Sequence, residues 1–75
     1  MKIYDFSKLE GRIKEKLKYN NVFAEKIGTS AASLSSKLNN KTDFTASEIS
    51  RAIEPDVLDL SVNEIGEYFF KEKLE

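Results

Sequence analysis

The stretch of sequence that decides the fold runs from Asn20 to Lys41 and reads NNVFAEKIGTSAASLSSKLNNK. Gly28 lies in its middle and can adopt the positive φ of a tight turn without strain. Ser30, two residues later, is a favourable helix N-cap. Apolar residues recur at helical spacing on both sides of this turn: Phe23, Ala24, Ile27, Ala31, Leu34 and Leu38. The stretch therefore predicts two short helices joined by a turn, over residues 20–39.

Two residues of this stretch have distinct steric roles. Ala24 is small enough to let the two helices cross closely, and Leu34 anchors the second helix so that its opposite face projects outward. This is the arrangement of a helix-turn-helix, whose second helix enters the major groove of DNA. An ordinary pair of antiparallel helices that has this spacing by chance is the alternative.

Helix-start signals on either side predict three more helices. Ser7 and Glu10 form a capping box at the start of a helix over about residues 8–18. A second box opens at Thr45, and its helix, with Ala52 facing inward, ends near Glu54, because Pro55 cannot continue it. After it, Val57, Leu58 and Leu60 are expected to pack on the core from a looser turn. Asn20 is the expected N-cap of the second helix, and Asn39-Asn40 ends the third, with Asn40 in a left-handed conformation. A third capping box, Ser61–Glu64, opens a short fifth helix that runs through Ile65, and Gly66 permits the chain to leave it.

The two chain ends are rich in β-forming residues, notably around Tyr4 and over residues 68–70. They favour a two-stranded ribbon between residues 2–5 and 67–72, and a fifth helix that runs on through Phe70 is the competing interpretation. The fold class predicted is all-α, with five helices and this possible ribbon. The aromatic residues 68–70 are expected to close the core rather than to form a dimer surface. The residues expected to be buried are Leu9, Ile13, Leu17, Phe23, Ala24, Ile27, Leu34, Leu38, Phe44, Ile49, Ile53, Leu60, Ile65 and Phe69.

Length and composition limit the functions open to the chain. Its 75 residues suffice for one domain, 1–75, and it contains neither Cys nor His. It therefore lacks a thiol nucleophile and the commonest general base and metal ligand, so we expect no enzyme, cofactor, small-molecule ligand or metal. Asp56 and Asp59 are interpreted as solvated loop acids rather than a metal pair. Because no apolar run approaches 18 residues and no signal peptide is visible, we expect a cytoplasmic protein without a membrane partner.

Charge is distributed unevenly along the chain. Residues 1–42 carry nine basic and four acidic residues, whereas residues 43–75 carry three basic and nine acidic ones. Such asymmetry often marks a protein with one face directed at a polyanion, although segregated solvated helix faces produce it too.

The stretch Asn20–Lys41 resembles the lambda-repressor-like (Cro/CI-type) helix-turn-helix family, with Ala24, Gly28, Ser30 and Leu34 in register. The segments SKLEGRIKEK, SLSSKLNNKTDFT and EIGEYFF are similar to those of small Cro-like and repressor-modulator proteins of phages of Gram-positive bacteria. The resemblance implies a set of nucleic-acid-binding residues. Asn20 would contact a DNA phosphate or cap its helix, and Asn39 and Lys41 would contact the DNA backbone. The rest of the surface would comprise Ala31, Ala32, Ser33, Ser35, Ser36 and Lys37.

The Ala and Ser residues of this surface would discriminate only weakly between base pairs, because specific recognition of DNA bases relies on Arg, Lys, Gln or Asn side chains. Phosphate contacts would come from Lys26, Lys37 and Lys41. Two functions therefore stay open. The favoured one is a transcriptional regulator that binds palindromic operator DNA as a homodimer. The alternative is a modulator that binds a partner phage repressor and masks its DNA-reading surface, to which the acidic C-terminal half would be suited.

Overall fold

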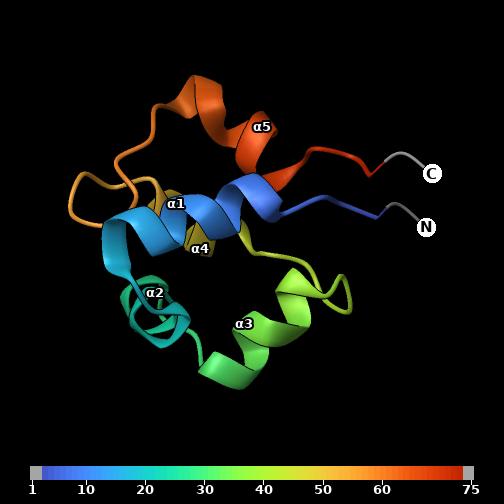
Figure 1. Ribbon diagram of the computed structural model, residues 1–75, viewed down its shortest axis with the longest axis horizontal. Coiled ribbons are helices and arrows are strands. Elements are labelled where there is room, and N and C mark those ends of the chain that lie inside the picture. The colour runs from blue at the N-terminus through green and yellow to red at the C-terminus, as the bar shows by residue number, and fades with distance from the viewer. Residues whose placement is uncertain (1–2, 74–75) are drawn as a thin grey trace.

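The computed structural model describes residues 3–73 and contains five α-helices within them, as predicted (Figure 1). A single turn of 3-10 helix, η1, leads directly into the last of them. The elements are α1 (Ser7–Leu17), α2 (Asn20–Ile27), α3 (Ala31–Leu38), α4 (Ala46–Ala52), η1 (Val62–Glu64) and α5 (Ile65–Phe69). Among the described residues, no helix is long and apolar enough to cross a membrane.

Helix α2 packs against three other helices, α1, α3 and α4. Helix α5 packs on α1, on the side away from α2 and α3 (Figure 1). Helix α3 lies at one edge, so that one side of it faces the core through Leu34 and the other side faces solvent. This is the placement that the sequence predicts for the second helix of the pair.

The core is made by the apolar faces of these helices and by the loop after α4. Most of the predicted core residues are buried, but five lie only partly buried at its rim: Leu17, Leu38, Phe44, Ile53 and Ile65. Phe6 completes the core without having been predicted. Ala52 on α4 is buried, and so are Val57 and Leu58 in the irregular segment after Pro55, as the sequence predicts.

The predicted capping box at the start of α1 is wrong. Ser7 is already inside the helix, and its amide and hydroxyl both donate to Asp5 Oδ1, at 2.9 and 2.7 Å. The Glu10 amide donates to the Phe6 carbonyl at 2.8 Å instead of to a side chain. Because an acidic residue two positions earlier accepts both hydrogen bonds, Ser7 has no need to act as the cap.

The two hydrogen bonds from Ser7 lower the pKa of the Asp5 carboxyl below its usual 3.8. A carboxyl with a lowered pKa in the folded state stabilises the fold above its unfolded pKa and loses that contribution as the pH falls. We therefore expect the Asp5→Asn variant to lose less stability than the wild type when the pH is lowered from 7 to 3. Urea unfolding midpoints at each pH measure this, with the exposed Asp56→Asn as control. Identical pH profiles for Asp5→Asn and wild type would contradict it.

The other caps match the sequence with two exceptions. Ser30 caps α3, Thr45 and Glu48 form the capping box of α4, and Gly28 adopts a left-handed conformation with φ of 82°. Asn40 is also left-handed, with φ of 62°. The first exception is Asn20, which is the first residue of α2 rather than its cap. The second is the box at Ser61, whose amide donates to Glu64 Oε2 at 3.2 Å and which opens the 3-10 turn η1 rather than α5 itself.

The C-terminal part departs further from expectation. Helix α4 ends at Ala52, earlier than Glu54, and Gly66 lies inside α5 rather than at its exit. The helix runs on to Phe69 because this ring is buried, 5.2 Å from the ring of Phe44 in an edge-on contact. Lys8 holds α5 on α1 through an ion pair with Glu67.

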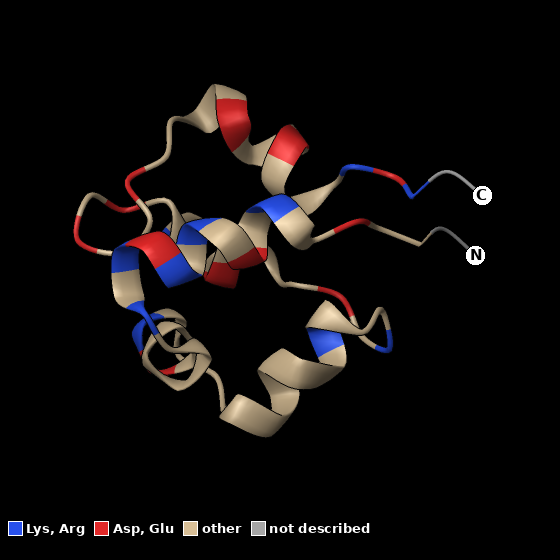
Figure 2. Cartoon of the chain, in the orientation of Figure 1, with Lys and Arg blue, Asp and Glu red and all other residues tan. Residues whose placement is uncertain are grey.

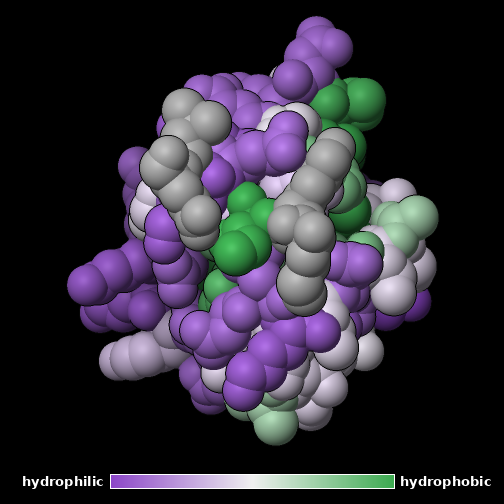
Figure 3. Space-filling model, turned by 90° about the vertical axis from the view of Figure 1, so that its right-hand side faces the viewer, coloured by the Kyte–Doolittle hydropathy of each residue, from purple (hydrophilic) through white to green (hydrophobic). Residues whose placement is uncertain are grey.

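The predicted ribbon is reduced to an isolated antiparallel bridge between Tyr4 and Glu72, with no strand among residues 3–73. The Asp5 amide donates to the Lys71 carbonyl and the Lys73 amide to the Ile3 carbonyl, each at 2.7 Å. Residue 2, part of the predicted ribbon, lies outside the described residues. The face of the molecule seen in Figure 3 has an apolar patch at its centre. Phe69 is buried and Tyr68 is half-buried, as expected for core closure, whereas Phe70 is 49% exposed.

Candidate functional site at helix α3

The outer face of α3 is formed by small, uncharged side chains. Ala31, Ala32 and Ser35 are exposed, as is Asn39 directly after the helix, whereas Ser33 is half-buried. Ser36, which was predicted to be exposed, is also half-buried. Ser36 directly precedes Lys37, whose side chain faces the core, so Ser36 lies beside the buried side of the helix rather than at the middle of its exposed face.

The inward-facing residue is Lys37, and its placement corrects the prediction that it belongs to the exposed surface and contacts phosphate. Lys37 is only 9% exposed, and its Nζ lies 3.6 Å from Glu48 Oε1 on α4. The same carboxylate oxygen accepts a hydrogen bond from the Thr45 amide at 2.9 Å. The aliphatic stem of a lysine packs well against apolar surface, and the paired carboxylate satisfies its charge. Lys37 therefore ties α3 to α4 instead of facing a phosphate.

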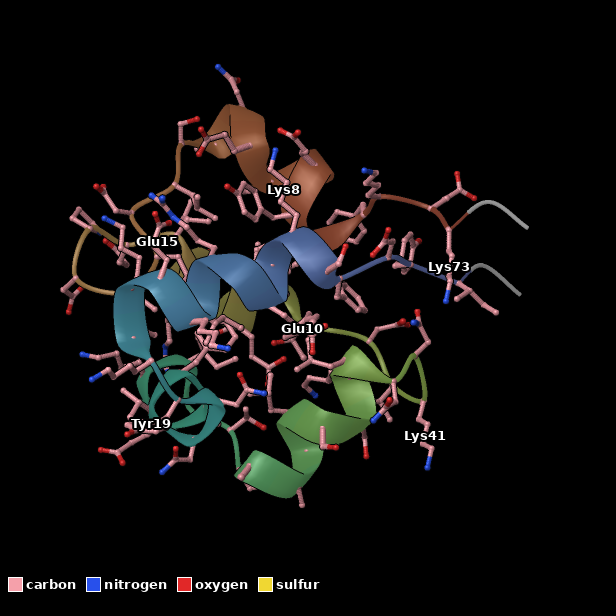
Figure 4. The ribbon with its side chains drawn as sticks, viewed as in Figure 1. Lys8, Glu10, Glu15, Tyr19, Lys41 and Lys73 are labelled. Atoms are coloured by element: carbon pink, nitrogen blue, oxygen red, sulfur yellow. The ribbon has the colours of Figure 1, made fainter. Side chains whose placement is uncertain are left out.

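This ion pair removes the one charged side chain of α3 from its outer face. Lys37 is the one charged residue of α3, Ala31–Leu38, and Figure 2 shows most of this helix in the tan of uncharged residues. Of the other lysines predicted to contact phosphate, Lys26 is exposed on α2 and Lys41 is exposed in the loop after α3, where its side chain points away from the body of the protein (Figure 4).

A groove separates α3 from α1. It consists of two adjoining cavities of about 340 and 220 Å³, whose linings share Glu10, Leu38 and Asn39. We call this feature the α1–α3 groove. The larger cavity extends past Tyr4 toward Lys73, and the smaller one extends along α3. Figure 4 shows Glu10 between the ribbons of α1 and α3.

The smaller cavity brings together four of the residues predicted for the site. Asn20, Ala31, Ser35 and Asn39 all contribute to its lining. The Asn39 amide nitrogen Nδ2 donates to the Ser35 carbonyl at 2.8 Å, which fixes its side chain against the end of α3. Ala32 and Lys41 are not part of this lining.

Two residues of the site were not recognised from the sequence. Glu10 was interpreted only as a capping residue, yet it lines both cavities of the α1–α3 groove. Glu10 precedes the half-buried Leu17 by seven residues, about two helical turns, so both lie on the same side of the helix. This spacing could have indicated that Glu10 lies beside the core rather than on the far side of α1. Asn40 was interpreted only as a helix end.

Asn40 in fact attaches the end of α3 to the N-terminal segment. Its Nδ2 donates to the Tyr4 carbonyl at 3.0 Å, and its Oδ1 accepts from the Tyr4 amide at 2.9 Å. The side-chain amide thus pairs with both backbone groups of Tyr4, as a neighbouring strand would. This contact holds the N-terminal segment, and with it one end of the α1–α3 groove, at a defined distance from α3.

In the described part of the chain, no three acidic side chains gather in a way that could hold a metal ion. The site consists of a neutral helix face and a groove with one acidic residue at its centre. Such an arrangement suits recognition of a surface.

Comparison with known proteins identifies relatives of the chain. No curated protein sequence matches significantly. The structure is similar to the solution structure of the modulator of repression (MOR) of the temperate bacteriophage TP901-1 from Lactococcus lactis, with a TM-score of 0.74 and 39% sequence identity, over 96% of this chain and 95% of that chain. The chain is thus related to a phage modulator of repression. The family model described as protein of unknown function (DUF739) matches residues 2–72, and the chain belongs to this family.

Proposed function

We propose that this protein modulates a phage repressor by binding it, through the outer face of α3 and the α1–α3 groove. The observation that carries the proposal is the inward position of Lys37, paired with Glu48 at 3.6 Å. It leaves a recognition surface made of Ala31, Ala32, Ser35 and Asn39, without a charged side chain.

Electrostatics favour a protein partner over DNA. Affinity for DNA depends mainly on lysine and arginine side chains that neutralise phosphates. Next to the outer face of α3, the α1–α3 groove instead carries Glu10. A carboxylate at this position would repel the phosphates that flank a major groove, whereas it would attract a basic protein surface.

The similarity to a modulator of repression supports the same choice. A repressor must present a basic surface to its operator. A neutral helix face bordered by an acidic groove is complementary to such a surface. Binding there would cover the residues that read DNA, and the repressor would leave its operator. We do not expect catalytic activity to contribute to this function.

Operator binding is the second candidate function, and one observation favours it. Helices α2 and α3, joined at the left-handed Gly28, have the order of a lambda-repressor-like (Cro/CI-type) helix-turn-helix, with the outer face of α3 exposed. In that case the protein would bind a palindromic operator as a homodimer, and α3 would enter the major groove.

Titrations with the repressor and the operator of the same phage distinguish the two functions. We expect the protein to form a complex with purified repressor, seen by calorimetry, and to release repressor from labelled operator DNA. On its own it should not bind that DNA even at about 50 mM salt, where phosphate contacts are strongest. Direct operator binding that weakens steeply with salt would favour the second function. Failure to bind the repressor would overturn the first.

A further inference from the structure

We propose that the α1–α3 groove is the docking site for an arginine side chain of the partner repressor, and that the Glu10 carboxylate is its ion-pair partner. This inference rests on the proposed function and adds to it the chemistry of the contact.

The lining of the groove suits a long side chain with a charged end. Leu38 and Asn39 lie where the two cavities meet, and Ala31 and Leu34 line the smaller one. An arginine that enters there would place its aliphatic stem on apolar surface and its guanidinium near Glu10. The smaller cavity, about 220 Å³, has room for such a side chain.

Glu10 is the acidic group of the groove that has no partner among residues 3–73. It takes part in none of the ion pairs or side-chain hydrogen bonds of the described chain. The other acid, Asp5, is engaged by the amide and hydroxyl of Ser7. Lys73, the basic residue of the lining, borders only the larger cavity.

A partner that covers the groove must therefore supply a positive charge. Removing the Glu10 carboxylate from water without a cation would be costly, so an uncharged partner surface would bind poorly. Arginine suits the position better than lysine, because its planar guanidinium can pair with both carboxylate oxygens. It is also the commonest side chain with which proteins read guanine, so a repressor's DNA-reading surface is a ready source of it.

The test compares Glu10→Gln with the wild type in calorimetric titrations against the purified repressor. Glu25→Gln is the matched control, because Glu25 is an exposed acid on α2 that does not line the groove. We expect Glu10→Gln to weaken binding about tenfold and Glu25→Gln to leave it unchanged. The loss should shrink as salt is raised from about 50 to 300 mM, and thermal unfolding should be the same for all three proteins.

A double-mutant cycle identifies the arginine. Each arginine on the DNA-reading surface of the repressor is replaced by alanine and titrated with wild type and Glu10→Gln. For one of these arginines, the affinity lost in the double variant should be clearly smaller than the product of the two single-variant losses. Wild-type affinity in Glu10→Gln, or the absence of any coupled arginine, would overturn the docking site in the groove but leave intact the proposal that the protein binds the repressor through the outer face of α3. If the wild-type protein does not bind the repressor at all, both fail.

Discussion

Replacing Leu34 with alanine is expected to lower the free energy of unfolding by about 2–5 kcal/mol. Leu34 is 1% exposed and belongs to the core, on the inner face of α3. Removing most of its side chain would lose apolar burial and leave a cavity that the surrounding helices fill only in part. A domain of this size has only about 5–15 kcal/mol of stability, so a large share of it would be lost. Urea unfolding followed by circular dichroism measures the change.

Leu38→Ala is the matched control, since Leu38 lies on the same helix but only partly buried. We expect it to cost clearly less than Leu34→Ala, because the cavity it leaves is open to water. A loss below about 1 kcal/mol for Leu34→Ala would contradict its position in the core. If Leu34 were on the outside, the helix-turn-helix register and the outward face assigned to α3 would both be wrong.

The parts of the fold that could be predicted depend on residues close together in the sequence. The caps at Ser30 and Thr45 and the left-handed Gly28 each involve groups at most four positions apart. Short-range rules describe such contacts well. The same rules failed at Ser7, because the Asp5 carboxylate accepts hydrogen bonds from both its amide and its hydroxyl, and the Glu10 amide donates to the Phe6 carbonyl instead.

The parts that could not be predicted depend on distant partners. Asn40 bonds Tyr4 across 36 positions, and Lys37 is buried because Glu48 of the next helix faces it. Nothing in the helical pattern of α3 distinguishes a lysine that reaches outward from one that reaches inward. The composition of the candidate site was therefore visible in the sequence, but its charge was not. That charge, neutral on α3 and acidic at Glu10, decides which partner the surface suits.

Adding bulk at Ala32 is expected to weaken repressor binding about tenfold or more. Ala32 is exposed on the outer face of α3, and small residues at the centre of an interface allow close packing that a larger side chain disrupts. Two variants of nearly equal size, Ala32→Gln and Ala32→Glu, separate bulk from charge. Neither touches the core, and a glutamate in the first turn of a helix is favourable, so stability should not fall.

The ratio of the two affinities distinguishes the partners. On a basic repressor surface, the charge of Ala32→Glu is attractive, so this variant should bind no worse than Ala32→Gln. Against DNA the order reverses, because the same charge would face phosphates, and Ala32→Glu should lose much more than Ala32→Gln. Anisotropy titrations with labelled repressor and labelled operator measure both. If neither variant changes either affinity, α3 is not part of the binding surface, and its uncharged outer face does not serve recognition of a partner.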